Sequence, residues 1–168
     1  MDYSFLAQLG RGLRVVAVDR AVFPREKACS EYMSPETVRQ FAALGVLDAI
    51  RPHAVPLEGA RVYGPRGAAL VGLFGETNPP GVPSHGVSLP RRVLDALLVD
   101  RARAEGVTVL ERTRVIDLVR DGGAVTGATI EQSGRSTIEA GVVIGADGLH
   151  SVVSQRLGGR RTEPLRRF

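Results

Sequence analysis

At 168 residues, the chain is long enough for one ordinary domain with a buried core. Its hydrophobic content of 43% and charged content of 24% are typical of globular proteins, and its apolar runs are too short to span a bilayer. The net charge of +4 comes almost entirely from arginine, and the basic residues are scattered among acids except for Arg160, Arg161, Arg166 and Arg167. Because only Phe168 accompanies that cluster, we interpret it as a solvated tail and expect no nucleic-acid partner.

The compartment is indicated by the single cysteine and by the N-terminal residues. Cys29 has no second cysteine with which to form an internal disulfide, which suits a reducing environment. The N-terminus lacks the basic and apolar regions of a secretory signal. We therefore expect a cytoplasmic protein without a transmembrane segment.

The first predicted elements are the last turn of a helix at residues 6–12 and a strand at residues 13–18, which ends at Asp19 and Arg20. In a dinucleotide-binding βαβ unit, an acid at the end of the second strand binds a ribose, about 20 residues after a glycine-rich loop. Counting back from Asp19 by that distance reaches or passes Met1, and the pattern G-x-G-x-x-G occurs nowhere in the chain. We therefore interpret Asp19 as a ribose-binding acid and expect the first strand, the glycine loop and most of the first helix to be missing. The alternative is a surface acid that ends a strand.

The next segment is expected to hold one helix followed by a hairpin. Ser34 caps a helix that has Pro35 at its first position and ends before Gly45. The other elements expected in this part, from turn residues and prolines, are a short turn at residues 46–50, strands at residues 60–63 and 68–73, and a loop at residues 75–86.

The clearest helix begins at Ser88 or Pro90 and ends at Gly106, because three leucines between them form an apolar stripe. The strands expected after this helix are, in chain order, residues 107–110, 114–119, 125–132 and 136–139. Glycine-containing turns join the last three into a β-meander.

Near the end of the chain, the apolar run at residues 142–144 predicts a strand that is buried on both faces. Asp147 and Gly148 then form a tight turn into a helix-like segment at residues 149–157. Gly148 has no Cβ, so a ligand can approach its backbone, and the Asp147 carboxylate can accept hydrogen bonds from sugar hydroxyls. The alternative is a buried strand whose aspartate only caps the following helix.

Three stretches resemble motifs of flavin-dependent oxidoreductases of the p-hydroxybenzoate hydroxylase and geranylgeranyl reductase class. The segment GADGLHSVVSQRLG resembles the Asp-Gly motif G-A-D-G-x-x-S-x-V-R, with Ser154 where arginine is usual. Residues 24–35 resemble P-R-x-K-x-C-G-x-x-x-S-P, with Ser30 where glycine is usual. The helix that opens at Arg91 resembles R-x-x-L-D-x-x-L.

The resemblance implies FAD as the cofactor and NAD(P)H as the reductant of a full-length relative, with a small apolar or aromatic substrate. In that class, Arg91 would lie by the FAD pyrophosphate, the backbone of Val115 would contact the adenine, and Cys29 would lie near the flavin. The cofactor-binding residues expected in this chain are Asp19, Arg20, Arg91, Val115, Asp147 and Gly148. We name no catalytic acid, base or nucleophile, and no metal ligand.

The fold class expected is α/β: an FAD-binding, Rossmann-like domain of the glutathione-reductase type without its first strand, with part of a β-rich substrate domain. The FAD-binding domain would take residues 1–58 and 89–168, and the substrate-domain insertion would take residues 59–88. The expected function is that of an FAD-binding oxidoreductase fragment, a flavin monooxygenase or prenyl reductase, incomplete for FAD binding and catalysis. The alternatives are an NAD(P)-binding Rossmann dehydrogenase and a non-catalytic truncated product.

Overall fold

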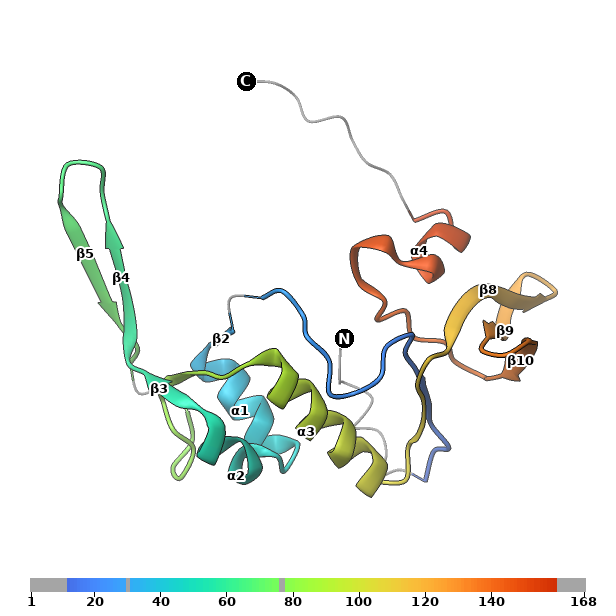
Figure 1. The fold of residues 1–168 in the computed structure, drawn as a ribbon, viewed down its shortest axis with the longest axis horizontal. Helices are drawn as coiled ribbons and strands as arrows, with labels where there is room; N and C mark the ends of the chain where they lie inside the picture. The colour runs from blue at the N-terminus through green and yellow to red at the C-terminus, as the bar shows by residue number, and fades with distance from the viewer. Residues whose placement is uncertain (1–11, 30, 76–77, 160–168) are drawn as a thin grey trace. The chain divides into compact units, whose positions relative to one another are not determined.

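The computed structural model describes residues 12–29, 31–75 and 78–159, and these form a mixed α/β fold (Figure 1). They divide into two compact units, here called the meander unit and the helical unit. The meander unit contains residues 16–22 and 109–159, and the helical unit contains the other described residues. The predicted helix end before Gly12, the substituted Ser30 and the basic tail from Arg160 lie outside the described residues.

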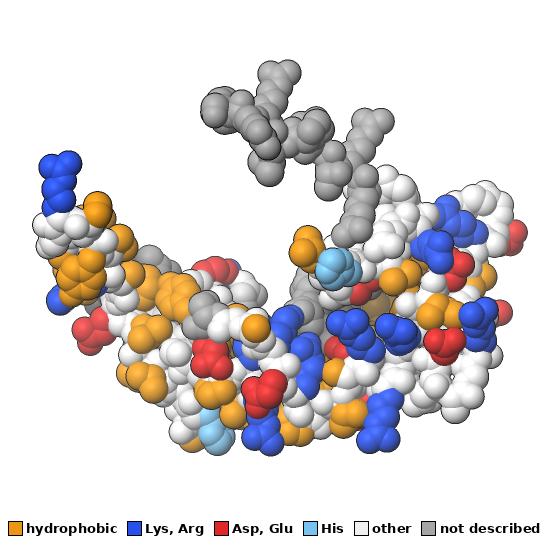
Figure 2. All heavy atoms as spheres, turned by 45° about the horizontal axis from the view of Figure 1, so that its top comes forward, with side chains coloured by type: hydrophobic (Ala, Val, Ile, Leu, Met, Phe, Trp, Pro, Cys, Tyr) orange, Lys and Arg blue, Asp and Glu red, His pale blue; other side chains and the backbone are white. Residues whose placement is uncertain are grey.

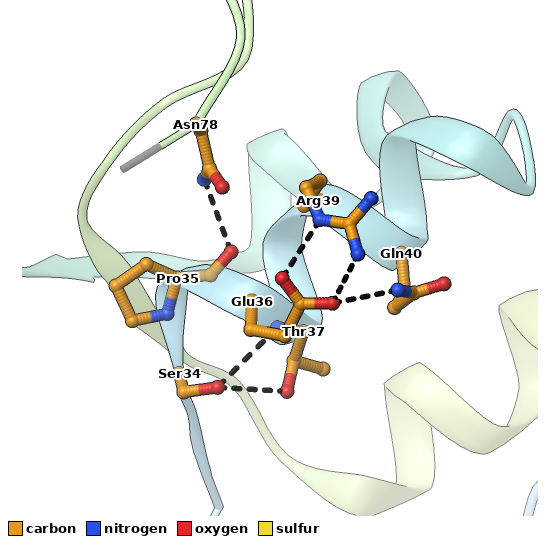
Figure 3. Close-up of polar contacts among 7 residues, drawn as sticks. All are labelled: Ser34, Pro35, Glu36, Thr37, Arg39, Gln40 and Asn78. Atoms are coloured by element: carbon orange, nitrogen blue, oxygen red, sulfur yellow. Dashed lines mark hydrogen bonds and ion pairs between the residues drawn. The ribbon is translucent and has the colours of Figure 1, made fainter. Parts of the chain in front are cut away.

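Helix α1 (Pro35–Ala43) is the first helix of the helical unit among the described residues, and it forms as predicted. The Ser34 hydroxyl accepts a hydrogen bond from the backbone N–H of Thr37 (3.3 Å), which satisfies one of the donors left unpaired at a helix start (Figure 3). The side-chain amide of Asn78 donates to the Pro35 carbonyl (3.0 Å), so the loop that contains Asn78 is attached to the first turn of α1. The helix ends where Gly45 takes a left-handed φ of +66°.

The remaining helices of this unit are α2 (Leu47–Ile50), the 3-10 turn η2 (Arg51–His53) and α3 (Arg91–Ala104). Helix α3 confirms the predicted amphipathic segment. It buries Leu94, Asp95, Leu98, Val99 and Ala102, so one carboxylate lies within an otherwise apolar face. The helix stops before Gly106, whose φ is +88°.

Two small sheets complete the helical unit. In the first, β6 (Gly86–Ser88) lies between β2 (Tyr32–Met33) and β3 (Val55–Leu57), with antiparallel pairing on both sides. This sheet was not predicted. The second is the predicted hairpin of β4 (Gly59–Tyr63) and β5 (Ala69–Leu73), whose side chains are largely exposed. Figure 2 shows hydrophobic side chains gathered over this hairpin.

In the meander unit, β1 (Val16–Val18) pairs with β7 (Thr108–Leu110), where the chain enters this unit. The backbone N–H of Thr108 donates to the Val15 carbonyl, and the N–H of Asp19 donates to the Leu110 carbonyl, an order typical of parallel strands. The predicted meander is confirmed. Its strands, in the spatial order β10-β9-β8, are β8 (Arg114–Asp121), β9 (Ala124–Glu131) and β10 (Arg135–Glu139).

The predicted strand at residues 142–144 is wrong. This segment belongs to none of the described strands, and Val142 is 78% exposed and Ile144 52% exposed. Among the described residues, the strand that pairs with β1 is β7, and residues 142–144 contribute to none of the sheets. The helix-like segment that follows is divided at Ser151 into the 3-10 turn η3 (Gly148–His150) and α4 (Val152–Arg156). Among the described residues, no helix combines the length and apolar character needed to cross a membrane.

Candidate functional site

Asp19 is fixed at the carboxyl end of β1 by its own backbone and side chain. Its N–H donates to the Leu110 carbonyl (3.0 Å), and its carbonyl accepts from the N–H of Thr113 (3.0 Å). Its carboxylate oxygen Oδ1 accepts from the N–H of Ala21 (2.8 Å), which closes a tight turn after the strand. Asp19 is half-buried and the neighbouring Arg20 is exposed, so an acidic group is held at a defined position at the strand end.

Residues 111–113, which follow β7, bond to the turn after β1, and we call these two segments the Asp19 corner. Arg112 adopts a left-handed φ of +52°, and its N–H donates to the Ala21 carbonyl (3.2 Å). Thr113 is 1% exposed, and its hydroxyl donates to the Glu111 carbonyl (2.8 Å). Sequence reasoning missed Thr113, because a threonine before a strand carries no distinctive pattern. Val115 follows two residues later in β8 and is half-buried, so the corner joins two of the predicted positions.

The Asp147-Gly148 turn is organised by the aspartate. Its Oδ2 accepts from the N–H groups of Val152 (2.6 Å) and Val153 (3.4 Å), and the Ser151 hydroxyl accepts from the N–H of Ser154 (2.9 Å). The alternative role of Asp147, capping the helix that follows, is therefore observed. Gly148 has a φ of +75°, which favours glycine, and its backbone is exposed.

The charge of Asp147 follows from these contacts. Partial burial acts to raise the pKa of Asp147, but hydrogen bonds from Ser151 and from backbone N–H groups, including those of Val153 and Val152, outweigh it. The pKa therefore lies below its ordinary value, and the carboxylate is ionised at neutral pH. A carboxylate has about four lone-pair positions, so a cap does not by itself exclude a further hydrogen bond from a ligand.

Helix α4 is attached to β8 through arginines. Arg156 pairs with the Asp117 carboxylate (Nε to Oδ1, 3.1 Å) and donates to the Ile116 carbonyl (3.3 Å). Arg120 donates to the Arg156 carbonyl (2.6 Å). Strand β8 thus connects the Asp19 corner with the segment that carries the Asp-Gly turn.

Arg91, the remaining predicted residue, lies in the helical unit and belongs to a cluster around the buried Asp95. Its Nε and Nη2 donate to Oδ1 of Asp95 (2.9 and 2.7 Å), and its Nη1 lies 3.8 Å from the sulfur of Cys29. Arg25 pairs with the other oxygen of Asp95 (Nη2 to Oδ2, 3.5 Å). Asp95 is fully buried, while Cys29 is exposed. We call Arg25, Cys29, Arg91 and Asp95 the arginine cluster.

The contacts of Arg91 with Asp95 and Cys29 keep its guanidinium charged. Burial acts to lower the pKa of Arg91, but the hydrogen bonds to Asp95 and Cys29 outweigh it and raise the pKa above its ordinary value. Sequence reasoning gave Asp95 no role. Its position in the sequence could have indicated a buried ion pair. Asp95 lies on the same helix face as Leu94 and Leu98, and a charged residue buried there must be paired.

Of the six predicted positions, the structure places Asp19, Arg20, Val115, Asp147 and Gly148 in the meander unit and Arg91 in the helical unit. Within the described residues, no group of three or more His, Cys, Asp or Glu side chains could hold a metal ion. The arrangement offers acidic groups suited to hydroxyls and, separately, a cationic cluster suited to an anion.

Comparison with known proteins identifies the family of the chain. The family described as FAD binding domain matches residues 4–166. The menaquinone reductase of Mycolicibacterium smegmatis is 30% identical over 161 residues, which cover 92% of this chain and 36% of that protein. The digeranylgeranylglycerophospholipid reductase of Methanothrix thermoacetophila is 34% identical over 155 residues, which cover 88% of this chain and 36% of that protein.

A solved structure shows the same relationship. The crystal structure of pqsL, a probable FAD-dependent monooxygenase from Pseudomonas aeruginosa, superposes with a TM-score of 0.75 at 25% identity, over 96% of this chain and 43% of that chain. The chain thus spans about a third of the length of the two curated relatives (36% of each). These matches confirm the resemblance to FAD-dependent reductases and monooxygenases that the sequence motifs indicated. The chain belongs to the FAD binding domain family.

Proposed function

We propose that this chain forms the adenosine side and part of the phosphate side of an FAD site in an FAD-dependent oxidoreductase. The observation that carries the proposal is the half-buried Asp19 at the carboxyl end of β1, fixed by bonds to Leu110, Thr113 and Ala21. In open α/β sheets, ligands bind outside the carboxyl ends of the strands, and an acid there suits the ribose hydroxyls. The family match supports FAD as the nucleotide.

The other residues of the meander unit would surround the same nucleotide. Val115 would offer its backbone to the adenine, and Arg20 would supply a cation beside Asp19. The exposed backbone of Gly148 fits a close approach by the cofactor, because no Cβ stands there. Asp147 would use the acceptor capacity that remains beside its helix cap.

Arg91 would bind the pyrophosphate. A guanidinium carries five N–H donors in a planar fork that matches phosphate oxygens, and the pKa of Arg91 is raised, so its charge persists. The flavin, when bound, supplies the redox chemistry, and this chain supplies binding, orientation and charge. The reaction would be a hydroxylation or a double-bond reduction of a small apolar or aromatic substrate, with NAD(P)H as the reductant.

We also propose the finer architecture. The β1–β7 pair would belong to a glutathione-reductase-type FAD-binding domain whose first strand lies outside the described residues. Residues 1–58 and 89–168 would form this domain, and residues 59–88, with the β4–β5 hairpin, would form part of a β-rich substrate domain.

Equilibrium dialysis of the 168-residue chain against FAD tests the proposal. We expect retention weaker than micromolar, because the sequence has no G-x-G-x-x-G loop to bind the pyrophosphate. Asp19→Ala and Arg91→Ala should each weaken binding, by about tenfold to a hundredfold for one lost charge-assisted hydrogen bond.

Two exposed residues provide matched controls, Asp121→Ala at the end of β8 and Arg66→Ala in the β4–β5 turn. Neither control should change retention. Equal retention by Asp19→Ala, Arg91→Ala and these controls would overturn the proposed site, and micromolar or tighter retention would contradict the expected weakness.

A further inference from the structure

Helix α4 is too short to be stable by itself. It has five residues, and none of its side chains is buried. Helices shorter than about 12 residues are marginal in water unless tertiary contacts stabilise them. Val153 lies close to Gly145, but that contact joins α4 only to the segment that precedes it. The helical conformation of α4 therefore depends on its contacts with the rest of the meander unit.

Arg156, the last residue of α4, bonds to β8 with both its side chain and its backbone. Its Nε pairs with Oδ1 of Asp117 (3.1 Å), and its Nη2 donates to the Ile116 carbonyl (3.3 Å). Its own carbonyl accepts from Nη2 of Arg120 (2.6 Å). A single residue thus attaches the end of α4 to the meander.

The acceptors that β8 offers to Arg156 are held in place by the strand. The register with β9 shifts between Val115 and Asp117, which leaves Ile116 as the extra residue of a β-bulge. The Asp117 carboxylate also accepts from the backbone N–H of Leu118 (2.8 Å), and this hydrogen bond fixes its orientation. The bulge therefore presents a carbonyl and an oriented carboxylate on neighbouring residues.

The other end of α4 holds the Asp147 carboxylate. Its Oδ2 accepts from the N–H groups of Val152 and Val153, the first two residues of the helix. These groups are free of intrahelical partners and point at Asp147 only while the first turn of α4 is helical. If α4 unfolds, the carboxylate loses donors that orient it. One short helix thus couples the Asp-Gly turn to the bulge of β8.

Arg156 does not take the place of the arginine in the motif that this segment resembles. That arginine corresponds to Ser154 in this sequence. Two positions of a helix that are two residues apart point about 200° away from each other around its axis. The contact of Arg156 with β8 is therefore a feature of this chain's own sequence.

We infer that Arg156 is a positioning residue of the Asp-Gly turn. By attaching the end of α4 to the bulge of β8, it keeps α4 helical and so orients the Asp147 carboxylate for a ligand hydroxyl. This inference rests on the proposed FAD function and adds two residues to it, Arg156 and its partner Asp117. Neither of them touches the ligand, and both act only through Asp147.

The first experiment measures the pKa of the Asp147 carboxyl by NMR titration in the wild-type chain and in Arg156→Gln. Partial burial acts to raise this pKa, but hydrogen bonds from Ser151 and from backbone N–H groups, including those of Val153 and Val152, lower it below its ordinary value of 3.8. If Arg156 keeps α4 helical, the substitution removes those hydrogen bonds and the pKa rises toward 3.8. Amide exchange at Val152 and Val153 should accelerate at the same time.

The variant Asp117→Ala separates positioning from charge. Loss of the Arg156 cation alone raises the pKa of a nearby carboxylate, whereas loss of the Asp117 anion alone lowers it. Positioning instead predicts that Arg156→Gln and Asp117→Ala both raise the pKa of Asp147. A lowered or unchanged pKa in Asp117→Ala overturns the inference.

Two exposed residues of the meander unit are matched controls, Arg135→Gln in β10 and Asp121→Ala at the end of β8. Neither should change the pKa of Asp147 or amide exchange in α4. The side chains of Arg156 and Asp117 are each 52% exposed, so we expect the β8–β10 meander to keep its amide protection when either is replaced. Faster exchange throughout the meander, rather than in α4 alone, would show a general loss of stability and overturn the positioning role.

The second experiment measures the Kd for FAD by equilibrium dialysis in Arg156→Gln, in Asp147→Ala and in the double variant. Each single substitution should raise the Kd by about tenfold, the loss expected for one charge-assisted hydrogen bond. The double variant should bind no more weakly than Asp147→Ala alone, because Arg156 acts through Asp147. Additive effects would show that Arg156 acts independently and overturn the inference.

The same measurement separates the inference from the proposed function. If Asp147→Ala weakens FAD binding and Arg156→Gln does not, the positioning role is overturned while the FAD function stands. If Asp19→Ala weakens binding and neither of these two does, the Asp-Gly turn lies outside the site, and the inference fails while the role of Asp19 stands. If none of the three substitutions changes the Kd, the inference and the proposed function are both overturned.

Discussion

At the scale of single residues, two carboxylates that pair with arginine differ in their exposure to solvent, and the effect of losing the partner differs with it. Glu36 lies on the exposed side of α1, and its carboxylate accepts from Arg39 and Gln40 (Figure 3). These hydrogen bonds lower the pKa of Glu36 to about 2. Asp95 makes similar bonds while fully buried, where loss of its partner would leave an uncompensated charge. An exposed pair is therefore replaceable, whereas a buried one constrains its surroundings.

The substitution Arg39→Ala should raise the pKa of Glu36 toward its ordinary value of 4.5, because Arg39 is the main cause of the shift. A lowered pKa stabilises the fold above pH 4.5, and this contribution is lost as the pH falls through about 2. An NMR titration of the Glu36 carboxyl measures the shift. Arg51→Ala, which removes the partner of Asp48 instead, should leave the Glu36 titration unchanged.

Ser34→Ala should destabilise the fold by about 1 kcal/mol, because the N–H of Thr37 then loses its acceptor at the start of α1. Urea denaturation measures this change in the free energy of unfolding. Ser136→Ala on the exposed surface of β10 should change it by less than about 0.5 kcal/mol. Equal effects of the two substitutions would show that the cap contributes nothing.

How much of the site was predictable from the sequence depends on the kind of contact. The positions of Asp19 and Asp147 followed from motifs and spacing, because a strand end or a turn is a local feature. The ion pair of Arg25 and Asp95 did not, because it joins residues about 70 positions apart in the chain. The i to i+4 spacing of Arg91 and Asp95 was visible, but it is also typical of solvent-exposed helix pairs.

At the scale of elements, turns were predictable and long-range strand pairing was not. The β4–β5 hairpin and the β8–β10 meander were identified because glycine-containing turns join neighbouring strands. The sheet of β2, β6 and β3 was missed because its strands are two or three residues long and come from distant segments. Residues 142–144 have a strand-like composition, but a strand also needs a partner, and none of the described strands pairs with them.

Gly145→Ala should displace α4, because a Cβ at residue 145 would lie 2.7 Å from Cβ of Val153. We expect a loss of about 1–3 kcal/mol in the free energy of unfolding, or faster amide exchange at Val152 and Val153 if only α4 detaches. Gly141→Ala is the matched control, since a Cβ there meets nothing within 4 Å. Unchanged stability and unchanged exchange in Gly145→Ala would contradict the close packing of α4.

At the scale of the whole molecule, the β4–β5 hairpin carries several exposed large hydrophobic side chains, among them Leu70 and Leu73. Its register places Val62 opposite Leu70 on one face and Arg61 opposite Val71 on the other, so apolar side chains occur on both faces. Exposed apolar strands favour association between chains. We therefore expect the purified chain to be poorly soluble.

Leu70→Lys and Leu73→Lys should raise the solubility limit without lowering the melting temperature, since these side chains are 73% and 74% exposed. Light scattering against protein concentration and a thermal melt measure the two quantities. Leu94→Lys, at a buried position of α3, should instead lower the melting temperature or abolish folding. An unchanged solubility limit in both hairpin variants would show that another surface drives association.

The meander unit is discontinuous in sequence, because residues 16–22 join a segment that begins only at residue 109. During synthesis, β1 emerges long before β7, so its ladder partner does not yet exist and the intervening segment must first form a closed loop. Closing a long loop is entropically costly, and parallel strands of high contact order form slowly. The carboxyl end of β1, with Asp19, should thus be among the last parts of the chain to acquire native amide protection in a refolding experiment, after the locally closed meander.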